Sequence, residues 1–379
     1  MEYRTLGKTG LKVSRLGFGA MRLPLVDEST RFLPNADVRV DLPLATSMLH
    51  TAFKAGLNYV DTSSVYCQGR SEAALGEAFK GWRDRLVVSS KNPDYGTDEK
   101  TWWTNLEQSL AKMQIEYIDV YHHHGLSWKR FTEVVAPVQS KWMLRAKDQG
   151  LIRHIAASIH DTPENTRQVI DAGYIEVALV PYSLLDRKLE EVIAHAHATG
   201  IGVAVMNPLA KGRLGRDLPA EEIRRMAPGA RWWSEAALQF VWSNPGIDVA
   251  LSGMMSMRDV ERNLAAADAG GIPGAQRERM AAWADRFSGT KAVPCTECGY
   301  CSPCPQGVNI PRVFSYYNDA QGLGGWDAAR SGYQRWDGWN PGKEADACTE
   351  CGTCEPKCPQ KIAIRELLKQ AHEELRRRS

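Results

Sequence analysis

Leu57-Asn-Tyr-Val-Asp61-Thr-Ser-Ser-Val-Tyr66 is a short apolar run that ends in a carboxylate and is followed by a phenol. Two further apolar runs also end in ionisable side chains. Leu86-Val-Val-Ser-Ser-Lys91 ends in an ammonium, and Ile118-Asp-Val-Tyr-His-His-His124 ends in an imidazole. If each run is a strand, three successive strands deliver Asp61, Tyr66, Lys91 and His124 to one rim. This is how a parallel βα barrel builds a catalytic site.

Strand-like and helix-like segments alternate on both sides of this stretch. The expected strands are Leu16–Ala20, Leu57–Val60, Leu86–Lys91, Ile118–His124, Ile152–Ser158, Val177–Val180, Gly202–Met206 and Val249–Ser252. They are short and rich in Val, Ile and Ala, which is typical of a parallel sheet buried on both faces. Eight such units favour a (β/α)8 TIM barrel over a doubly wound sheet. A hairpin over Tyr3–Val13 is expected to plug its bottom.

The domain organisation follows from a change in composition near residue 290. A helix over Pro273–Phe287 is expected to close the barrel, and residues 288–291 read as a linker. We therefore predict a barrel domain over 1–288. A small α+β domain is expected over 292–379, ending in a helix over about 364–377. It holds 8 of the 9 cysteines, in two runs each closed by Cys-Pro, which is the pattern of a ferredoxin-like iron-sulfur domain.

Composition excludes several classes of partner. The chain has 379 residues, 43% hydrophobic and 24% charged, with a net charge of +2, so nothing indicates a nucleic-acid or anionic-membrane partner. No apolar run approaches the roughly 20 residues that span a bilayer. The start, Met1-Glu-Tyr-Arg4, has no signal-peptide core, which predicts a cytoplasmic protein.

The four rim residues suit the reduction of a carbonyl group. A tyrosine can protonate the oxygen, but its ordinary pKa near 10 makes it a slow acid, and a nearby ammonium such as Lys91 lowers that pKa. Asp61 can hold Lys91 by a salt bridge, and His124 can orient the carbonyl. Strand alternation sends His122 and His124 to one face and His123 to the other, which argues against a three-histidine metal site. Taken singly, each residue is as easily explained by an ordinary structural role.

Asp61-Thr-x-x-x-Tyr66, Lys91 and the Tyr117-Ile-Asp-x-Tyr-x-x-His124 pattern together resemble the Asp-Tyr-Lys-His tetrad of aldo-keto reductases. Leu16-Gly-Phe-Gly19 and Ser71-Glu72 also match the family. The resemblance implies that Tyr66 is the proton donor, tuned by Asp61 and Lys91, and that His124 orients the carbonyl. It also implies a nicotinamide dinucleotide, NADP(H) or NAD(H), over the barrel mouth. The implied nucleotide contacts are Gly19, Asp61, Ser158, Met206, Gly253, Arg258 and Asn263.

Several positions depart from the family pattern around the nucleotide. Ile159 stands where the family has asparagine, and Leu179 where it has glutamine, so only Ser158 remains of the usual nicotinamide carboxamide ligands. Met206 replaces the usual aromatic residue, and Gly253 replaces the usual 2′-phosphate lysine, for which Arg258 can substitute. The preference for NADP over NAD therefore rests on the resemblance, and impaired binding of the nicotinamide stays open as an alternative.

The chain has 9 cysteines, and 8 follow residue 294 in two runs, each closed by Cys-Pro. The first run is Cys295, Cys298, Cys301 and Cys304, and the second is Cys348, Cys351, Cys354 and Cys358. Such runs are typical of two-cluster ferredoxins, in which the fourth cysteine of a run binds the other [4Fe–4S] cluster. One cluster is assigned to Cys295, Cys298, Cys301 and Cys358, and the other to Cys304, Cys348, Cys351 and Cys354. Zinc is the competing ligand, although its sites usually use separated Cys-x-x-Cys pairs.

Three functions remain open at this point. The first is an aldo-keto reductase-type oxidoreductase that reduces a small carbonyl substrate with NAD(P)H and carries an electron-transfer domain. The second is a cluster-driven reductase that passes single electrons to a substrate protonated by Tyr66. The third is a non-catalytic electron carrier or redox sensor with a redox partner protein. The clusters can also be structural, since small domains gain stability from bound metal.

Overall fold

The computed structural model describes residues 1–28, 37–210, 214, 220–289, 292–295, 301–323, 326–334, 342–358 and 360–377. These residues form two compact units, one of Met1–Glu28 with Val38–Ala281 and a second from Ala282 onward. The domain boundaries expected at 288 and 292 stay a prediction. Among the helices of the described residues, none is both long enough and apolar enough to cross a membrane.

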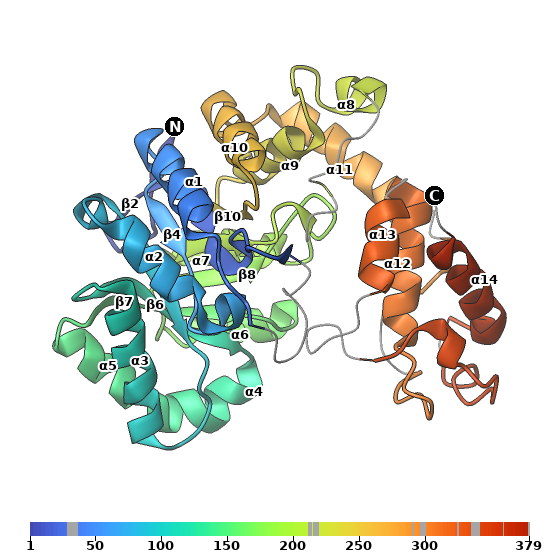
Figure 1. The fold of residues 1–379 in the computed structure, drawn as a ribbon, viewed down its shortest axis with the longest axis horizontal. Helices are drawn as coiled ribbons and strands as arrows, with labels where there is room; N and C mark the ends of the chain where they lie inside the picture. Colours follow the sequence, from blue (N-terminus) through green and yellow to red (C-terminus); the bar gives the residue numbers. More distant parts are fainter. Residues whose placement is uncertain are drawn as a thin grey trace. The chain divides into compact units, whose positions relative to one another are not determined.

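The first unit is a closed barrel of eight parallel strands (Figure 1). The strands are β3 (Leu16–Gly19), β4 (Tyr59–Asp61), β5 (Val87–Asn92), β6 (Ile118–Leu126), β7 (Ile152–Ile159), β8 (Val177–Pro181), β9 (Gly202–Met206) and β10 (Val249–Gly253). They follow one another around the barrel in chain order, and β10 pairs with both β9 and β3. Each strand overlaps one of the expected strands, so the predicted TIM barrel is confirmed.

Helices lie between successive strands and cover the outside of the barrel (Figure 1). They are α1 (Leu42–Lys54), α2 (Ser71–Phe79), α3 (Glu99–Met113), α4 (Trp128–Arg130), α5 (Ser140–Asp148), α6 (Pro163–Asp171), α7 (Glu190–Thr199), α8 (Ala220–Met226), α9 (Trp233–Trp242) and α10 (Met257–Ala269). A π-helical segment, η5 (Phe131–Gln139), separates α4 from α5, and Pro137 inside it lacks the backbone donor that a regular helix needs.

The N-terminal hairpin closes the bottom of the barrel, as expected. Strands β1 (Tyr3–Thr5) and β2 (Lys12–Ser14) pair in antiparallel fashion. Leu6 and Val13 are fully buried in the cluster that fills the barrel interior. Burying a side chain of this size contributes about 1.5–3 kcal/mol, so the plug both seals and stabilises the end opposite the rim.

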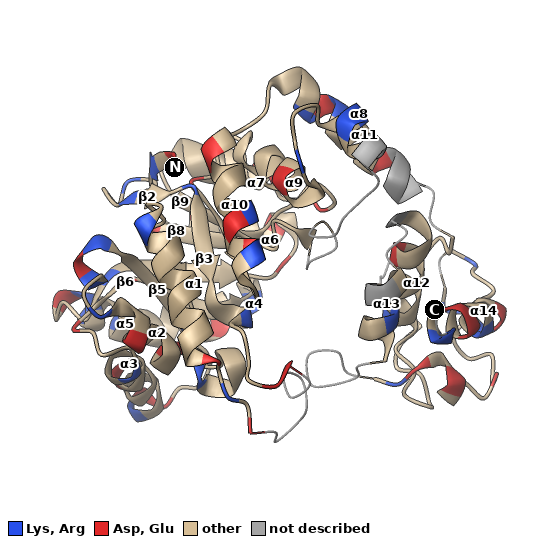
Figure 2. Cartoon of the chain, turned by 45° about the horizontal axis from the view of Figure 1, so that its top comes forward, with Lys and Arg blue, Asp and Glu red and all other residues tan. Residues whose placement is uncertain are grey.

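The second unit is mainly helical in the part that the structure describes. Its elements are α12 (Ile310–Leu323), α13 (Trp326–Tyr333), the short 3-10 helix η7 (Ala345–Ala347) and α14 (Ile364–Arg376); α11 (Gly274–Gly289) precedes them. Its β structure, among the described residues, is one parallel bridge between Val308 and Lys343. The helices enclose a core of their own, against which six cysteines pack. Figure 2 shows Lys and Arg interspersed with Asp and Glu along α3 and α14, so neither helix carries one sign of charge.

Candidate functional site

The carboxyl ends of three neighbouring strands bring together the four rim residues. Asp61 ends β4, Lys91 lies near the end of β5 and His124 near the end of β6. Tyr66 starts a short 3-10 helix, η3 (Tyr66–Gly69), in the segment that follows β4. The strand register pairs Asp61 with Ser89 and Lys91 with His122, so these side chains point to the same barrel interior.

Asp61 and Lys91 form a buried ion pair. Lys91 Nζ lies 2.6 Å from Asp61 Oδ1 and donates a second hydrogen bond to the backbone oxygen of Thr62 at 2.7 Å. The two residues are only 4% and 1% exposed. Burial opposes the charge on Lys91, but the carboxylate of Asp61 and the phenol of Tyr66 together outweigh it and raise the pKa of Lys91. The ammonium therefore stays charged at neutral pH.

Tyr66 lies against both the ammonium and the imidazole. Lys91 Nζ is 4.8 Å from the centroid of the Tyr66 ring, and the His124 ring meets that ring edge-on at a centroid distance of 5.8 Å. Burial raises the pKa of Tyr66, and Lys91 acts in the opposite direction. The expectation that Lys91 lowers this pKa is right in sign, but desolvation is larger and the net shift is upward. The Tyr66 phenol is therefore protonated at neutral pH.

His124 is held as a neutral imidazole. Its Nδ1 lies 3.1 Å from Ser63 Oγ. Burial, reinforced by the charge on Lys91, lowers the pKa of His124 to about 3. When Ser63 donates to Nδ1, the proton of the imidazole lies on Nε2 and is available to a substrate oxygen.

A bulge in β6 directs His124 into the site. The register with β7 shifts between His123 and Leu126, and Gly125 has a φ of +69°, which glycine adopts without strain. The Gly125 amide donates to Ser158 Oγ at 2.8 Å, and the Tyr95 hydroxyl donates to the backbone oxygen of His124. These two hydrogen bonds fix the backbone of His124 and Gly125, next to the imidazole.

The other two histidines have separate partners. His122 is fully buried, with Nε2 3.0 Å from Ser89 Oγ. His123 faces the opposite side of the sheet, where Nε2 lies 3.1 Å from the Tyr174 hydroxyl. The three imidazoles therefore do not converge on a metal site, in agreement with strand alternation.

The residues proposed to contact the nucleotide fall into two groups. Gly19, Met206, Gly253 and Arg258 are partly or fully exposed at the carboxyl ends of β3, β9 and β10 and the start of α10. Ser158 is 1% exposed and Asn263 is 3% exposed; the Asn263 amide donates to Ser252 Oγ at 2.8 Å. The exposed rim with its glycines fits a bound nucleotide. Ser158 and Asn263 are buried instead, and their side chains already form hydrogen bonds within the protein.

Two serines of the site were not assigned a role from the sequence. Ser63 contacts His124, and Ser89 Oγ donates to Asp61 Oδ2 at 2.8 Å. Ser89 lies two residues before Lys91 on the same strand, so strand alternation alone places it beside the lysine. This spacing of two residues from Lys91 is the feature of the sequence from which Ser89 could have been predicted.

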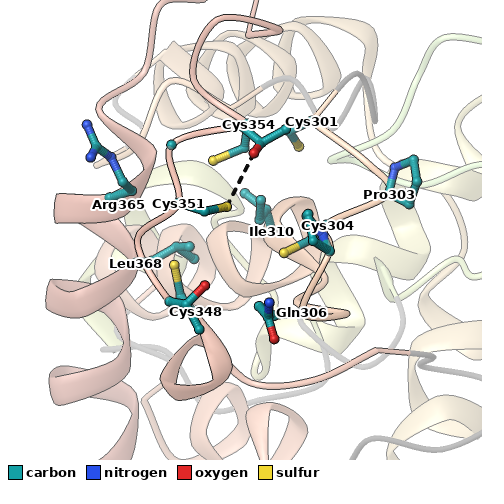
Figure 3. Close-up of a pocket in the computed structure, with 14 residues that line it drawn as sticks. Cys301, Pro303, Cys304, Gln306, Ile310, Cys348, Cys351, Cys354, Arg365 and Leu368 are labelled. Atoms are coloured by element: carbon teal, nitrogen blue, oxygen red, sulfur yellow. Dashed lines mark hydrogen bonds between the residues drawn. The ribbon is translucent and has the colours of Figure 1, made fainter.

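The cysteines gather at the edge of the second unit's core. None of the described cysteines is in a disulfide. Five cysteines line one pocket (Figure 3): Cys301, Cys304, Cys348, Cys351 and Cys354. Thiols gathered around one hollow match the donor type of an iron-sulfur cluster, and four of these five are the set expected for the second cluster. The Glu350 amide donates to Cys348 Sγ at 3.4 Å, and Thr353 Oγ1 lies 3.3 Å from Cys351 Sγ, where either atom can be the donor. Cys298 lies outside the described residues, and Cys295, Cys301 and Cys358 pack on the same core.

A closed parallel barrel with a buried Asp–Lys pair, a tyrosine and a neutral histidine at its rim defines a barrel oxidoreductase. Residues 15–282 match the model of the Aldo/keto reductase family, and residues 294–364 match that of the 4Fe-4S dicluster domain. The chain belongs to the aldo/keto reductase family and carries a C-terminal 4Fe-4S dicluster domain with eight cysteines.

Known relatives match about two thirds to three quarters of the chain. L-galactose dehydrogenase of Arabidopsis thaliana is 30% identical over 291 residues, which are 70% of this chain and 88% of the relative. NADH-specific methylglyoxal reductase of Escherichia coli is 26% identical over 253 residues, covering 62% and 75%. The solved structure of aldo-keto reductase AKR11C1 from Bacillus halodurans, in its holo form, superimposes with a TM-score of 0.62 at 26% identity. It covers 74% of this chain and 95% of that one.

Proposed function

We propose that the barrel reduces the carbonyl group of a small molecule with NAD(P)H and that Tyr66 supplies the proton. The observation that carries the proposal is the buried Asp61–Lys91 pair, whose ammonium lies 4.8 Å from the ring of Tyr66, with neutral His124 on the same ring. A scaffold has no need for a charged pair at this depth, because burying it costs several kcal/mol of desolvation.

The chain's residues would divide the work as follows. NAD(P)H, when bound, would supply the hydride for the carbonyl carbon. Tyr66 donates its phenolic proton to the carbonyl oxygen, so that one hydride and one proton give the alcohol. Lys91 stabilises the phenolate that is left, and Asp61 keeps Lys91 charged. His124, as the Nε2–H tautomer, donates a hydrogen bond that orients the oxygen.

Family members support a carbonyl–alcohol pair as the substrate class. One relative is named as a dehydrogenase of a sugar and another as a reductase of methylglyoxal, a small dicarbonyl. For this chain we propose Gly19, Met206, Gly253 and Arg258 as nucleotide contacts, since they lie accessible at one rim. Arg258 is the cation among them that can meet a 2′-phosphate, which favours NADP over NAD.

The test is turnover of a panel of aldehydes, ketones and sugars by the anaerobically purified protein with NADPH and with NADH. Tyr66→Phe is expected to lower kcat by about 100- to 10,000-fold, the usual contribution of a general acid, with nucleotide binding retained. The matched control is Tyr117→Phe, at the opposite end of the barrel, where the ring only packs under Arg83 and Arg153. Equal activity of the two variants would contradict the role of Tyr66.

For the second unit we propose two [4Fe–4S] clusters, the second held by Cys304, Cys348, Cys351 and Cys354. When bound, such clusters pass single electrons. Cys304→Ala is expected to remove about half of the iron and sulfide of the purified protein, whereas Cys67→Ala, in the barrel, is expected to leave both unchanged. Full iron content in Cys304→Ala would show that this cysteine is not a ligand.

A second candidate function is favoured by one specific observation. Ile159 and Leu179, at the positions of the family's carboxamide ligands, are apolar and at most 2% exposed. If nicotinamide binds weakly for this reason, the clusters would reduce the substrate one electron at a time. Reduction with 4-deuterated NAD(P)H separates the two functions. Deuterium on the product carbon supports hydride transfer, and its absence alongside turnover with a chemical reductant supports the cluster-driven reaction.

A further inference from the structure

His122 is a buried polar group that the proposed mechanism does not use. It points into the barrel interior, is fully buried, and is the register partner of Lys91 on the neighbouring strand. An apolar side chain would fill this position at a lower cost of desolvation. The hydrogen bonds around it give it a specific task.

The direction of each bond follows from the number of protons. Asp61 can only accept, and it does so from Lys91 at Oδ1 and from the Ser89 hydroxyl at Oδ2, 2.8 Å away. A serine hydroxyl has one proton, and that of Ser89 is used on Asp61. The remaining contact, from His122 Nε2 to Ser89 Oγ at 3.0 Å, therefore has the imidazole as donor. His122 is the neutral tautomer with its proton on Nε2.

The surroundings keep His122 in that state. Burial and then the charge of Lys91 lower the pKa of His122 well below its ordinary value. The ionisable groups that face this region are Lys91 on β5, Asp61 and Tyr59 on β4, and His123 and His124 on its own strand. On β7 its register partner is Ala156, which carries no charge.

We propose that His122 is a positioning residue of the barrel site: its Nε2–H bond to Ser89 turns the serine hydroxyl toward Asp61 and holds the carboxylate in place against Lys91. The inference rests on the proposed function of Asp61, Lys91 and Tyr66. Without the bond from His122, the Ser89 hydroxyl is held less firmly and Asp61 loses part of its stabilisation. Less of the carboxylate's charge is then neutralised near Tyr66, and this raises the pKa of the phenol and weakens it as an acid.

The first experiment compares His122→Leu, which cannot donate, with His122→Gln, whose amide can donate at about the same reach as Nε2. His122→Leu is expected to lower kcat by about 3- to 10-fold, the value of one hydrogen bond, and to move the basic limb of the pH–rate profile to higher pH. The KM for the nucleotide is expected to stay unchanged, and His122→Gln is expected to recover activity to within about 2-fold.

His123→Gln is the matched control, because that buried imidazole lies on the same strand but faces Tyr174. Its thermal stability is expected to fall while the pH–rate profile stays as in the parent. The proposal is overturned if His122→Leu leaves the basic limb in place, or if Gln at 122 is no better than Leu.

A second measurement does not depend on turnover. Side-chain 15N NMR of the 15N-histidine-labelled holoprotein, with His122→Gln to assign the signal, is expected to show a neutral Nε2–H imidazole from pH 5 to pH 9. An Nδ1–H tautomer, or titration of His122 within that range, refutes the inference. If this result holds but no carbonyl compound is reduced, the hydrogen-bond assignment stands and the proposed reaction fails.

Discussion

The buried ion pair gives the sharpest test of the barrel site. Lys91→Met replaces the ammonium by an apolar chain of similar length and leaves the Asp61 carboxylate, 4% exposed, with only the hydroxyl of Ser89. At 2.6 Å and an effective dielectric constant of about 20, the direct attraction is about 6 kcal/mol. Removing one partner of such a pair typically costs about 3–5 kcal/mol, because desolvation offsets part of that attraction.

This cost converts into a measurable shift of the melting temperature. For a unit of this size each kcal/mol corresponds to about 2–4 °C, so Lys91→Met is expected to melt roughly 6–20 °C below the parent at pH 8. Activity is expected to fall by at least about 100-fold. Without Lys91, nothing counters burial and the charge of Asp61, both of which raise the pKa of Tyr66.

The pH dependence has a defined sign. The pKa of Lys91 is raised above its ordinary 10.5, so its contribution to stability is complete below that value and is lost only as the pH rises through the raised value. In Lys91→Met the unpaired buried carboxylate is neutralised by taking up a proton as the pH falls. The difference in melting temperature between parent and variant is therefore expected to shrink from pH 8 to pH 5.

The assay is thermal unfolding followed by circular dichroism under anaerobic conditions. Lys91→Met/Asp61→Asn, which leaves no buried charge, is expected to recover part of the lost stability but none of the activity. Lys80→Met is the surface control, since its pair with Glu77 is 60% and 45% exposed and is screened by solvent. The reasoning is refuted if Lys91→Met has the same melting temperature as Lys80→Met. It is also refuted if Lys91→Met/Asp61→Asn is less stable than Lys91→Met.

Three further outcomes are expected. Ser158→Ala should lower kcat about 3- to 10-fold with little change in the nucleotide KM, because Ser158 holds the Gly125 amide beside His124; a rise in KM alone would contradict this. The pH–rate profile should show no limb from His124 between pH 5 and pH 8, because its pKa lies at about 3. Thr353→Val should lower the reduction potential of one cluster by about 20–60 mV in EPR-monitored titration, because it removes a hydrogen bond to Cys351.

The strand ends were predictable because two constraints act at once. An apolar run of four to seven residues is long enough to be a buried strand, and Asp61, Lys91 and His124 sit where such runs finish. Parallel strands must end at the same rim, so the sequence positions alone bring the side chains together. The alternation of His122, His123 and His124 was predictable for the same reason, since the period of a strand is two residues.

Contacts that depend on backbone irregularity could not be predicted in this way. The β6 bulge at Gly125 moves His124 out of register, and Ser63 meets that imidazole from a loop with no periodicity. The net rise in the pKa of Tyr66 depends on how deeply the ring is buried, which the neighbouring charges do not reveal. In the second unit, α12 and α13 went unassigned; each contains a glycine near its end, Gly322 and Gly332, and glycine is a poor helix former.

The number of protons in the barrel site bears on where the electrons come from. Reducing a carbonyl with a hydride requires one proton, whereas two single electrons require two, one of them delivered to carbon. Among the described residues of the site, Tyr66 is the acid that we propose. His124 is neutral at any pH well above 3, and Lys91 is held as an ammonium by Asp61. A site with one acid and a fixed charge behind it matches hydride transfer. Cluster-driven reduction would need a second acid near the substrate carbon, and so it predicts that Tyr66→Phe alone does not abolish uptake of electrons.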